Sequence, residues 1–231
     1  MKKVALCYSG QMRDFKPCFE THKQFLIENN KDCKFYIFGH IWHDSNLIGQ
    51  PYQDKYPERG YWSHDSILDF LKINPNLFLL EKPLNFNTSL IPDPRFPHPI
   101  QNILSMFYSM NKVKELKDSF KNQRDIQFDY VFRLRTDTLF KQEINLLSYD
   151  SNFLYVDDKC VHTEYGIGDL FGFGSEIEMD KYLSTYTSII DLIKKGCVVN
   201  PECILGFNLM DKRANIRKLP LENNMFKIFR Y

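Results

Sequence analysis

The 231-residue sequence has no apolar run near the roughly 18 residues of a membrane-spanning helix, so no membrane span is expected. It also has no excess of charge, because 30 Lys and Arg residues stand against 29 Asp and Glu residues. Such a balance gives no global field for nucleic acid or an anionic membrane. The apolar stretch behind Lys2 and Lys3 is too short for a secretory signal. None of the six cysteines forms a C-x-x-C pair, which favours reduced thiols in a cytoplasmic protein over a disulfide framework.

What the sequence does contain is an alternation of short apolar strands and amphipathic helices. Strands are predicted at residues 4–8, 35–38, 77–80, 128–134, 153–156, 170–173 and 216–219. Helices are predicted behind Asp14, at 65–71, at 100–120, behind a capping box of Ser175 and Glu178, and behind Asn200-Pro201. Strands separated by helices predict one α/β domain over residues 1–231, with a mostly parallel sheet.

Proline is concentrated in residues 82–99, which hold five of the eleven prolines. This segment can be neither a central strand nor a helix interior. It is either an irregular surface crossing or a loop that shapes a site.

The sharpest local pattern is a strand that ends in charge. Arg133, Arg135 and Asp137 alternate at the end of the strand predicted at 128–134, so they share one face if the strand continues. Ligands of open α/β sheets bind beyond the carboxyl ends of strands. The guanidiniums can hold phosphate oxygens, and Asp137 can offer oxygen to Mg²⁺ or Mn²⁺. The alternative is an internal ion pair in which an arginine neutralises Asp137.

A second group of polar residues follows the first predicted strand. Ser9, Gln11 and Arg13 are hydrogen-bonding side chains, and Gly10 permits a tight turn or a close backbone approach. The amides at the start of the next helix favour an anion. The segment is neither a Walker A loop nor G-x-G-x-x-G, and a plain turn is the alternative.

Three weaker candidates occur elsewhere. His40 and His43, after a strand that Gly39 is expected to end, are three residues apart but have no third zinc ligand at a familiar spacing, so a turn with an aromatic wall is favoured. Asp169, in the Gly-rich segment 164–175, is either a catalytic carboxylate, an acceptor ligand or a turn residue. Glu202 is a similar candidate, although carboxylates favour helix N-termini anyway.

These segments together resemble a group of viral and bacterial GT-A-like glycosyltransferases. The opening Ser9-Gly10-Gln11-Met12-Arg13 is similar to their Ser-Gly-Gln-x-Arg loop, and residues 130–138 are similar to their Tyr-x-x-x-Arg-x-Arg-x-Asp element. Residues 169–175 resemble their Asp-x-x-x-x-Gly-Ser strand. The matches spread from residue 4 to about residue 210.

The resemblance implies a GT-A fold, a Rossmann-like α/β/α sandwich that binds a nucleotide-diphosphate sugar. Ser9, Gly10 and Gln11 would face the nucleotide, Arg13 the base or pyrophosphate, and Asp169 the acceptor hydroxyl, which it would deprotonate if the enzyme inverts. The family's metal-binding Asp-x-Asp corresponds to Arg135-Thr136-Asp137, which lacks the first aspartate. Asp137 alone would then hold Mn²⁺ or Mg²⁺, or Arg133 and Arg135 would replace part of the metal's charge.

The expected activity is therefore transfer of a sugar from a nucleotide-diphosphate sugar to a carbohydrate or glycoconjugate hydroxyl, with no nucleic acid involved. Trp42, Tyr61 and Trp62 are candidates for the acceptor side, although core packing is the commoner use of such side chains. Two other functions stay open: a sugar-phosphate nucleotidyltransferase, and a non-catalytic nucleotide- or carbohydrate-binding module.

Overall fold

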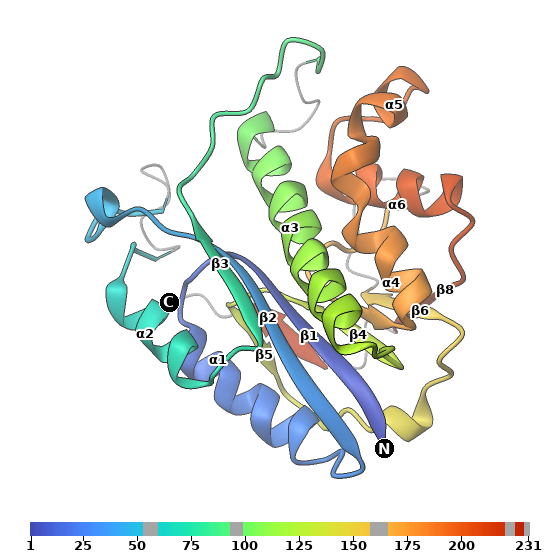
Figure 1. Cartoon of the computed structure of the whole chain (residues 1–231). Coiled ribbons are helices and arrows are strands. Elements are labelled where there is room, and N and C mark those ends of the chain that lie inside the picture. Colours follow the sequence, from blue (N-terminus) through green and yellow to red (C-terminus); the bar gives the residue numbers. More distant parts are fainter. Residues whose placement is uncertain (53–59, 93–98, 158–165, 220–224, 229–231) are drawn as a thin grey trace.

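A seven-stranded, mostly parallel sheet forms the centre of the single domain (Figure 1). The computed structural model describes residues 1–52, 60–92, 99–157, 166–219 and 225–228. The strand order is β3-β2-β1-β4-β7-β6-β8, and only β7 runs against its neighbours. The strands are β1 (Lys2–Gln11), β2 (Cys33–Trp42), β3 (Leu77–Glu81), β4 (Tyr130–Leu134), β6 (Leu154–Asp157), β7 (Gly172–Gly174) and β8 (Ile216–Leu219). The prediction of an α/β domain with a mostly parallel sheet is confirmed.

Helices cover both faces of this sheet (Figure 1). One face carries α3 (Ile100–Arg124), α4 (Glu176–Leu183), α5 (Ile189–Lys194) and α6 (Pro201–Asp211). The other carries α1 (Phe15–His22), α2 (His64–Lys72) and a small antiparallel sheet of β5 (Thr138–Phe140) and β9 (Phe226–Ile228). The arrangement is a three-layer sandwich.

Side-chain alternation divides the apolar core between the two faces. In β4, Val131 packs on the α3 side, whereas Tyr130, Phe132 and Leu134 pack on the α1 side, as the alternation predicted. All five β4 residues are buried, as expected of a strand in the middle of a covered sheet.

Two strands extend further than predicted. β1 continues through Ser9-Gly10-Gln11, so this segment is the end of a strand rather than a turn that breaks it. β2 continues through Gly39 to Trp42. A Cβ at Gly39 would overlap the ring of Phe70 in α2, so the glycine provides room for helix packing and does not end the strand.

The predicted helix starts are largely confirmed. Asn200 Oδ1 accepts from the amides of Glu202 (3.0 Å) and Cys203 (3.3 Å), with Pro201 as the first helical residue. Ser175 Oγ accepts from the Glu178 amide at 3.3 Å, but the Glu178 carboxylate bonds Lys181 instead of closing the capping box. Asp14 occupies the N-cap position of α1 without a side-chain cap bond.

Other expectations are met in part. Cys7, Cys18, Cys33 and Cys197 are free thiols, Cys203 is buried, and Cys160 lies outside the described residues. Residues 82–92 of the Pro-rich segment are irregular apart from a turn, and residues 93–98 lie outside the described residues. Glu164 and Tyr165 of the Gly-rich segment lie outside them as well. Within the described ranges, no helix combines the length and apolarity needed to span a membrane.

Candidate functional site

The candidate site is the region where the ends of β1 and β4 lie next to each other and the order of the parallel strands reverses. From β1 the sheet continues through β2 to β3 on one side and begins with β4 on the other. The β1–β4 pairing ends at Tyr8 and Leu134, whereas β1 stays paired with β2 as far as Gln11 and Trp42. The ends of β1 and β4 therefore separate at the carboxyl edge of the sheet, where ligands of such sheets bind.

Asp137 lies in the turn between β4 and β5 and holds two arginines. Its Oδ1 accepts from Arg135 Nε at 2.8 Å, and its Oδ2 accepts from Arg135 Nη2 at 2.7 Å and from Arg13 Nη1 at 2.5 Å. The Asp137 side chain is 1% exposed, whereas those of Arg13 and Arg135 retain 15% and 18%. The ion pair of Arg135 with Asp137, left open by the sequence, is present, and the pair of Arg13 with Asp137 joins the two strand ends.

Hydrogen bonds from Thr136 and Gln11 fix the same two segments. Thr136 Oγ1 donates to the Gln11 carbonyl at 2.5 Å and accepts from the Arg13 amide at 3.3 Å. Gln11 Oε1 accepts from Arg13 Nη2 at 3.3 Å. Gly10 has φ +114°, and a Cβ there would meet no described atom within 4 Å, so the end of β1 is open on that side. Ser9 is buried in the strand.

Arg133 is fully buried on the α3 and α4 side of β4. Its Nη1 donates to the Leu170 carbonyl at 2.5 Å, and its Nε has no hydrogen-bond partner among the described residues. Burial lowers the pKa of Arg133, and Tyr182 and Asp169 partly offset this. No carboxylate among the described residues pairs with Arg133, and burying a guanidinium without such a partner is costly.

Two carboxylates complete this edge of the sheet. Asp169 lies just before β7, near enough to raise the pKa values of Arg133 and Arg135. Asp157 ends β6 and is buried against Gly168, where a Cβ would overlap its carboxylate. The predicted donor-binding residues and Asp169 thus gather at one end of the sheet.

The charge state of the central pair follows from these contacts. Burial raises the pKa of Asp137, but Arg135 and then Arg13 outweigh it, so the pKa lies well below its usual range. Asp137 is therefore ionised at every physiological pH, and its charge is neutralised by the two guanidiniums.

A divalent cation does not fit at Asp137 in this arrangement. Both of its oxygens already accept hydrogen bonds from guanidiniums, and almost none of the side chain is exposed. At 4 Å two like unit charges repel by about 4 kcal/mol near a protein surface, and a dication doubles this for each guanidinium. The metal-binding role of Asp137 stays a prediction, which this geometry does not support.

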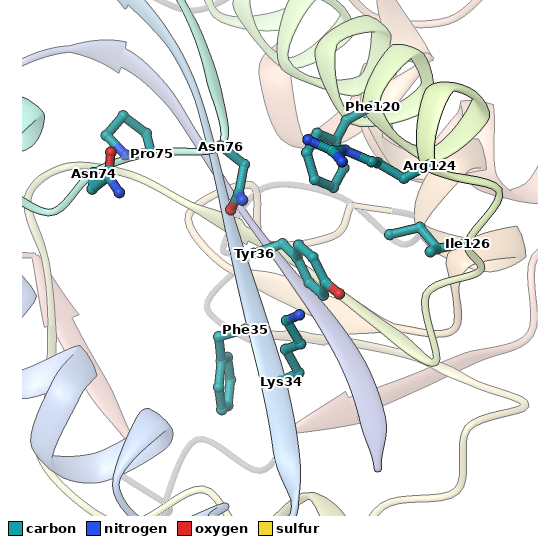
Figure 2. Close-up of a pocket in the computed structure, with 9 residues that line it drawn as sticks. All are labelled: Lys34, Phe35, Tyr36, Asn74, Pro75, Asn76, Phe120, Arg124 and Ile126. Carbon is teal, nitrogen blue, oxygen red and sulfur yellow. The ribbon is translucent and has the colours of Figure 1, made fainter.

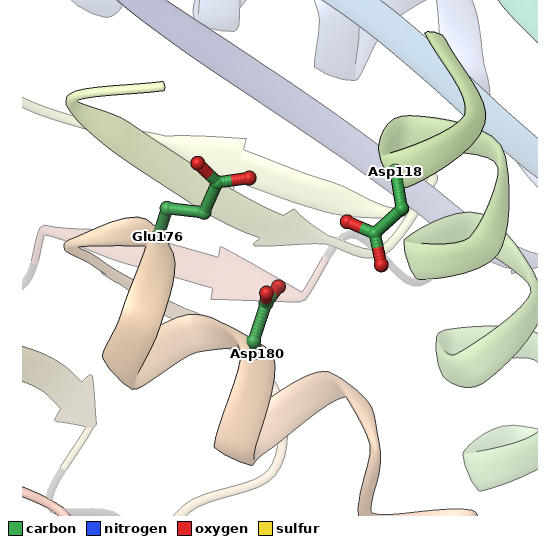
Figure 3. Close-up of side chains that lie close together, drawn as sticks. All are labelled: Asp118, Glu176 and Asp180. Atoms are coloured by element: carbon green, nitrogen blue, oxygen red, sulfur yellow. The ribbon is translucent and has the colours of Figure 1, made fainter. Parts of the chain in front are cut away.

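A cluster of three carboxylates between α3 and α4 could also hold a metal ion, but it surrounds a buried lysine. Figure 3 shows Asp118 of α3 facing Glu176 and Asp180 of α4. The buried ammonium of Lys117 lies among them, at 2.6 Å, 2.7 Å and 3.1 Å from their respective oxygens. A lysine already supplies the countercharge, so this group joins two helices.

A cavity of about 550 Å³ lies at the opposite edge of the sheet (Figure 2). Lys34, Phe35 and Tyr36 from the start of β2 line it, together with Phe120 and Arg124 from the end of α3. This is the amino edge, away from the separated ends of β1 and β4. We therefore do not assign the candidate site to it.

The histidines and aromatics at the end of β2 and after it are mostly structural, and His40 and Trp42 belong to the strand rather than to a turn. His40 Nε2 contacts Glu81 Oε2 and its Nδ1 contacts Ser109 Oγ, both at 2.8 Å, so the ring is held inside the fold. Among the described residues, neither His40 nor His43 belongs to a group of three possible metal ligands. Trp42 and Trp62 are buried, whereas Tyr61 is exposed. Glu202 lies in the first turn of α6.

Sequence reasoning missed Thr136, Tyr52 and Asp157. Asp157 had the same signal as Asp137, a carboxylate at the carboxyl end of an apolar strand. Tyr52, whose OH donates to the Met12 carbonyl at 2.5 Å and whose ring lies 5.9 Å from Arg13, had no signal in the sequence.

No protein-family model matches the chain, and no curated protein matches it.

Proposed function

We propose that the protein is a glycosyltransferase that binds a nucleotide-diphosphate sugar at the adjacent ends of β1 and β4. The observation that carries the proposal is the convergence of Arg13 and Arg135 on Asp137 at the reversal of strand order. Two guanidiniums held in place and partly exposed suit the bidentate recognition of phosphate oxygens. The resemblance of the same segments to GT-A-like enzymes supplies the reaction class.

In this mechanism the arginines stabilise the charge that develops on the leaving diphosphate. Gly10 leaves room for the donor, and Ser9 and Gln11 lie at the strand end beneath it. Asp169 is assigned to the hydroxyl of the carbohydrate or glycoconjugate acceptor, as a base or as a ligand. The free thiols support a cytoplasmic location.

Thermal unfolding with UDP, GDP, CDP and their sugars tests donor binding. A ligand at 100 times its Kd adds about 2.7 kcal/mol to the unfolding free energy, which raises Tm by several degrees. We expect a shift with one nucleotide family, its loss in Arg135→Gln and its retention in Arg124→Gln, which removes an arginine from the opposite edge of the sheet.

Turnover is then measured as release of the nucleoside diphosphate in a screen of carbohydrate acceptors. Binding without consumption of the donor would indicate a non-catalytic module. Pyrophosphate release from a nucleoside triphosphate and a sugar phosphate would indicate a nucleotidyltransferase. Absence of a shift with every nucleotide would contradict the proposal.

A further inference from the structure

Both carboxylate oxygens of Asp137 are occupied by arginines, so neither is left for a metal ion. A metal-binding aspartate must direct at least one oxygen toward the cation and its bound phosphates. Asp137 instead receives three hydrogen bonds from two guanidiniums and is 1% exposed. Its role in this geometry is to orient Arg13 and Arg135.

The arginines keep hydrogen-bonding capacity for a ligand. Arg135 uses Nε and Nη2 on Asp137, and its Nη1 has no partner among the described residues. Arg13 Nη1 donates to Asp137 and Arg13 Nη2 donates to Gln11. Its Nε has no hydrogen-bond partner among the residues that the structure describes. Both side chains still reach the surface, with 15% and 18% exposed.

Two guanidiniums face one carboxylate in the group of Arg13, Arg135 and Asp137. Arg133 adds a third guanidinium, and no described carboxylate lies within ion-pair distance of it. Asp137 neutralises one of the three cations, and Asp169 lies within electrostatic range of Arg133 and Arg135. Arg13, Arg135 and Asp137 together therefore carry one net positive charge, which is the charge that a bridging cation would otherwise supply. Asp157 and Asp169 lie on the β6 and β7 side of this edge.

We propose that Arg13 and Arg135, oriented by Asp137, bind the donor diphosphate directly and that donor binding requires no divalent cation. The inference rests on the proposed function, because it concerns the same diphosphate. It assigns Asp137 as a positioning residue and the two arginines as the phosphate ligands.

The decisive experiment compares binding with and without metal in the wild-type protein. Isothermal titration with UDP, GDP, CDP and inorganic pyrophosphate is carried out in excess EDTA and again in excess MnCl₂ or MgCl₂. We expect the Kd of the bound diphosphate to agree within about twofold between the two conditions. Loss of a charge-assisted contact is expected to weaken binding about tenfold or more in Arg135→Gln, and Arg124→Gln is expected to leave it unchanged.

A metal readout independent of activity uses the electron paramagnetic resonance of Mn²⁺. We expect the free Mn²⁺ signal to be the same with the wild type and with Asp137→Asn. Binding of Mn²⁺ that disappears in Asp137→Asn would overturn the inference. If Asp137→Asn does not fold, the EDTA comparison in the wild type decides alone.

The outcomes separate the two proposals. Diphosphate binding that occurs only with MnCl₂ or MgCl₂ would overturn the metal-free inference and leave the glycosyltransferase proposal intact. Failure of every diphosphate to bind in both conditions would overturn the proposed function itself, and the inference with it.

Discussion

Lys117 and Asp137 each place a buried charge between several groups of opposite sign. Lys117 contacts three carboxylates that belong to α3 and α4, and its side chain is fully buried. Burial lowers the pKa of Lys117, but Asp180 and the other carboxylates outweigh it and raise the pKa above its ordinary value. The ammonium therefore stays charged and stabilises the contact between the helices.

Replacing Lys117 by methionine should be strongly destabilising, because three carboxylates lose the buried ammonium that they share and keep only the more exposed Lys114 and Lys121. Removing one partner of a buried ion pair costs about 3–5 kcal/mol. The matched control is Lys112→Met, which breaks a pair with Glu115 on the surface of the same helix, for which less than about 1 kcal/mol is expected. Urea unfolding of the three proteins measures both values. Equal losses in the two variants would contradict a structural role for the buried ammonium.

The residues of the site differ in how far the sequence reveals them. Arg133, Arg135 and Asp137 were predicted because charge at the end of an apolar strand is unusual. The sequence left Arg133 and Arg135 as alternative partners of Asp137 and did not reveal Arg13 as a partner. The position of Arg13 depends on β1 continuing to Gln11 and on Thr136 reaching its carbonyl, a contact between residues far apart in the sequence.

At the scale of elements, Gly39 decides how closely α2 packs on β2. The sequence suggested that this glycine ends a strand, because glycine often interrupts one. The neighbour that requires it, Phe70, is 31 positions away and lies on another element. Local propensity does not contain this information, whereas the strand itself was predicted from its apolar residues.

Gly39→Ala is expected to destabilise the fold by about 1–3 kcal/mol, because the added methyl group overlaps the buried ring of Phe70. Combining it with Phe70→Leu provides the control, since a smaller side chain makes room for the methyl group. The double variant should lose less stability than the sum of the two single variants, as residues in contact do. Additive losses in chemical denaturation would show that the two positions do not compete for space.

The small sheet was the element that the sequence did not reveal. β5 and β9 have three residues each and are separated by most of the C-terminal half of the chain. Segments so short carry too little periodicity to be recognised. β5 follows the Asp137 turn directly, so this small sheet extends from one end of the candidate site.

At the scale of the whole molecule, His22 connects this small sheet to the central one. Tyr8 of β1 donates its OH to His22 Nδ1 at 2.8 Å, and His22 Nε2 donates to the Thr138 carbonyl of β5 at 2.6 Å. The carbonyl can only accept, which assigns the neutral ring with its proton on Nε2. Burial lowers the pKa of His22 to about 4, and the bond to Thr138 offsets only part of this effect.

This coupling makes global stability depend on pH. Between the unfolded pKa near 6.5 and the folded pKa of about 4, the unfolded chain binds more protons than the folded one at His22. The free energy of unfolding therefore falls as the pH falls through this window. At 1.36 kcal/mol per pH unit, His22 should account for a loss of about 2–3 kcal/mol between pH 7 and pH 4.5.

His22→Gln isolates this contribution, because glutamine does not titrate while other buried groups, such as His40, titrate in both proteins. Urea unfolding of the two proteins from pH 7 to pH 4.5 should show their stability difference shrinking as the pH falls. A difference that stays constant would mean that His22 does not stay neutral in the fold. The window lies above the usual pKa of Asp137, whose pairing with Arg13 and Arg135 keeps it ionised, so the candidate site is expected to retain its charges in the folded protein while the free energy of unfolding falls.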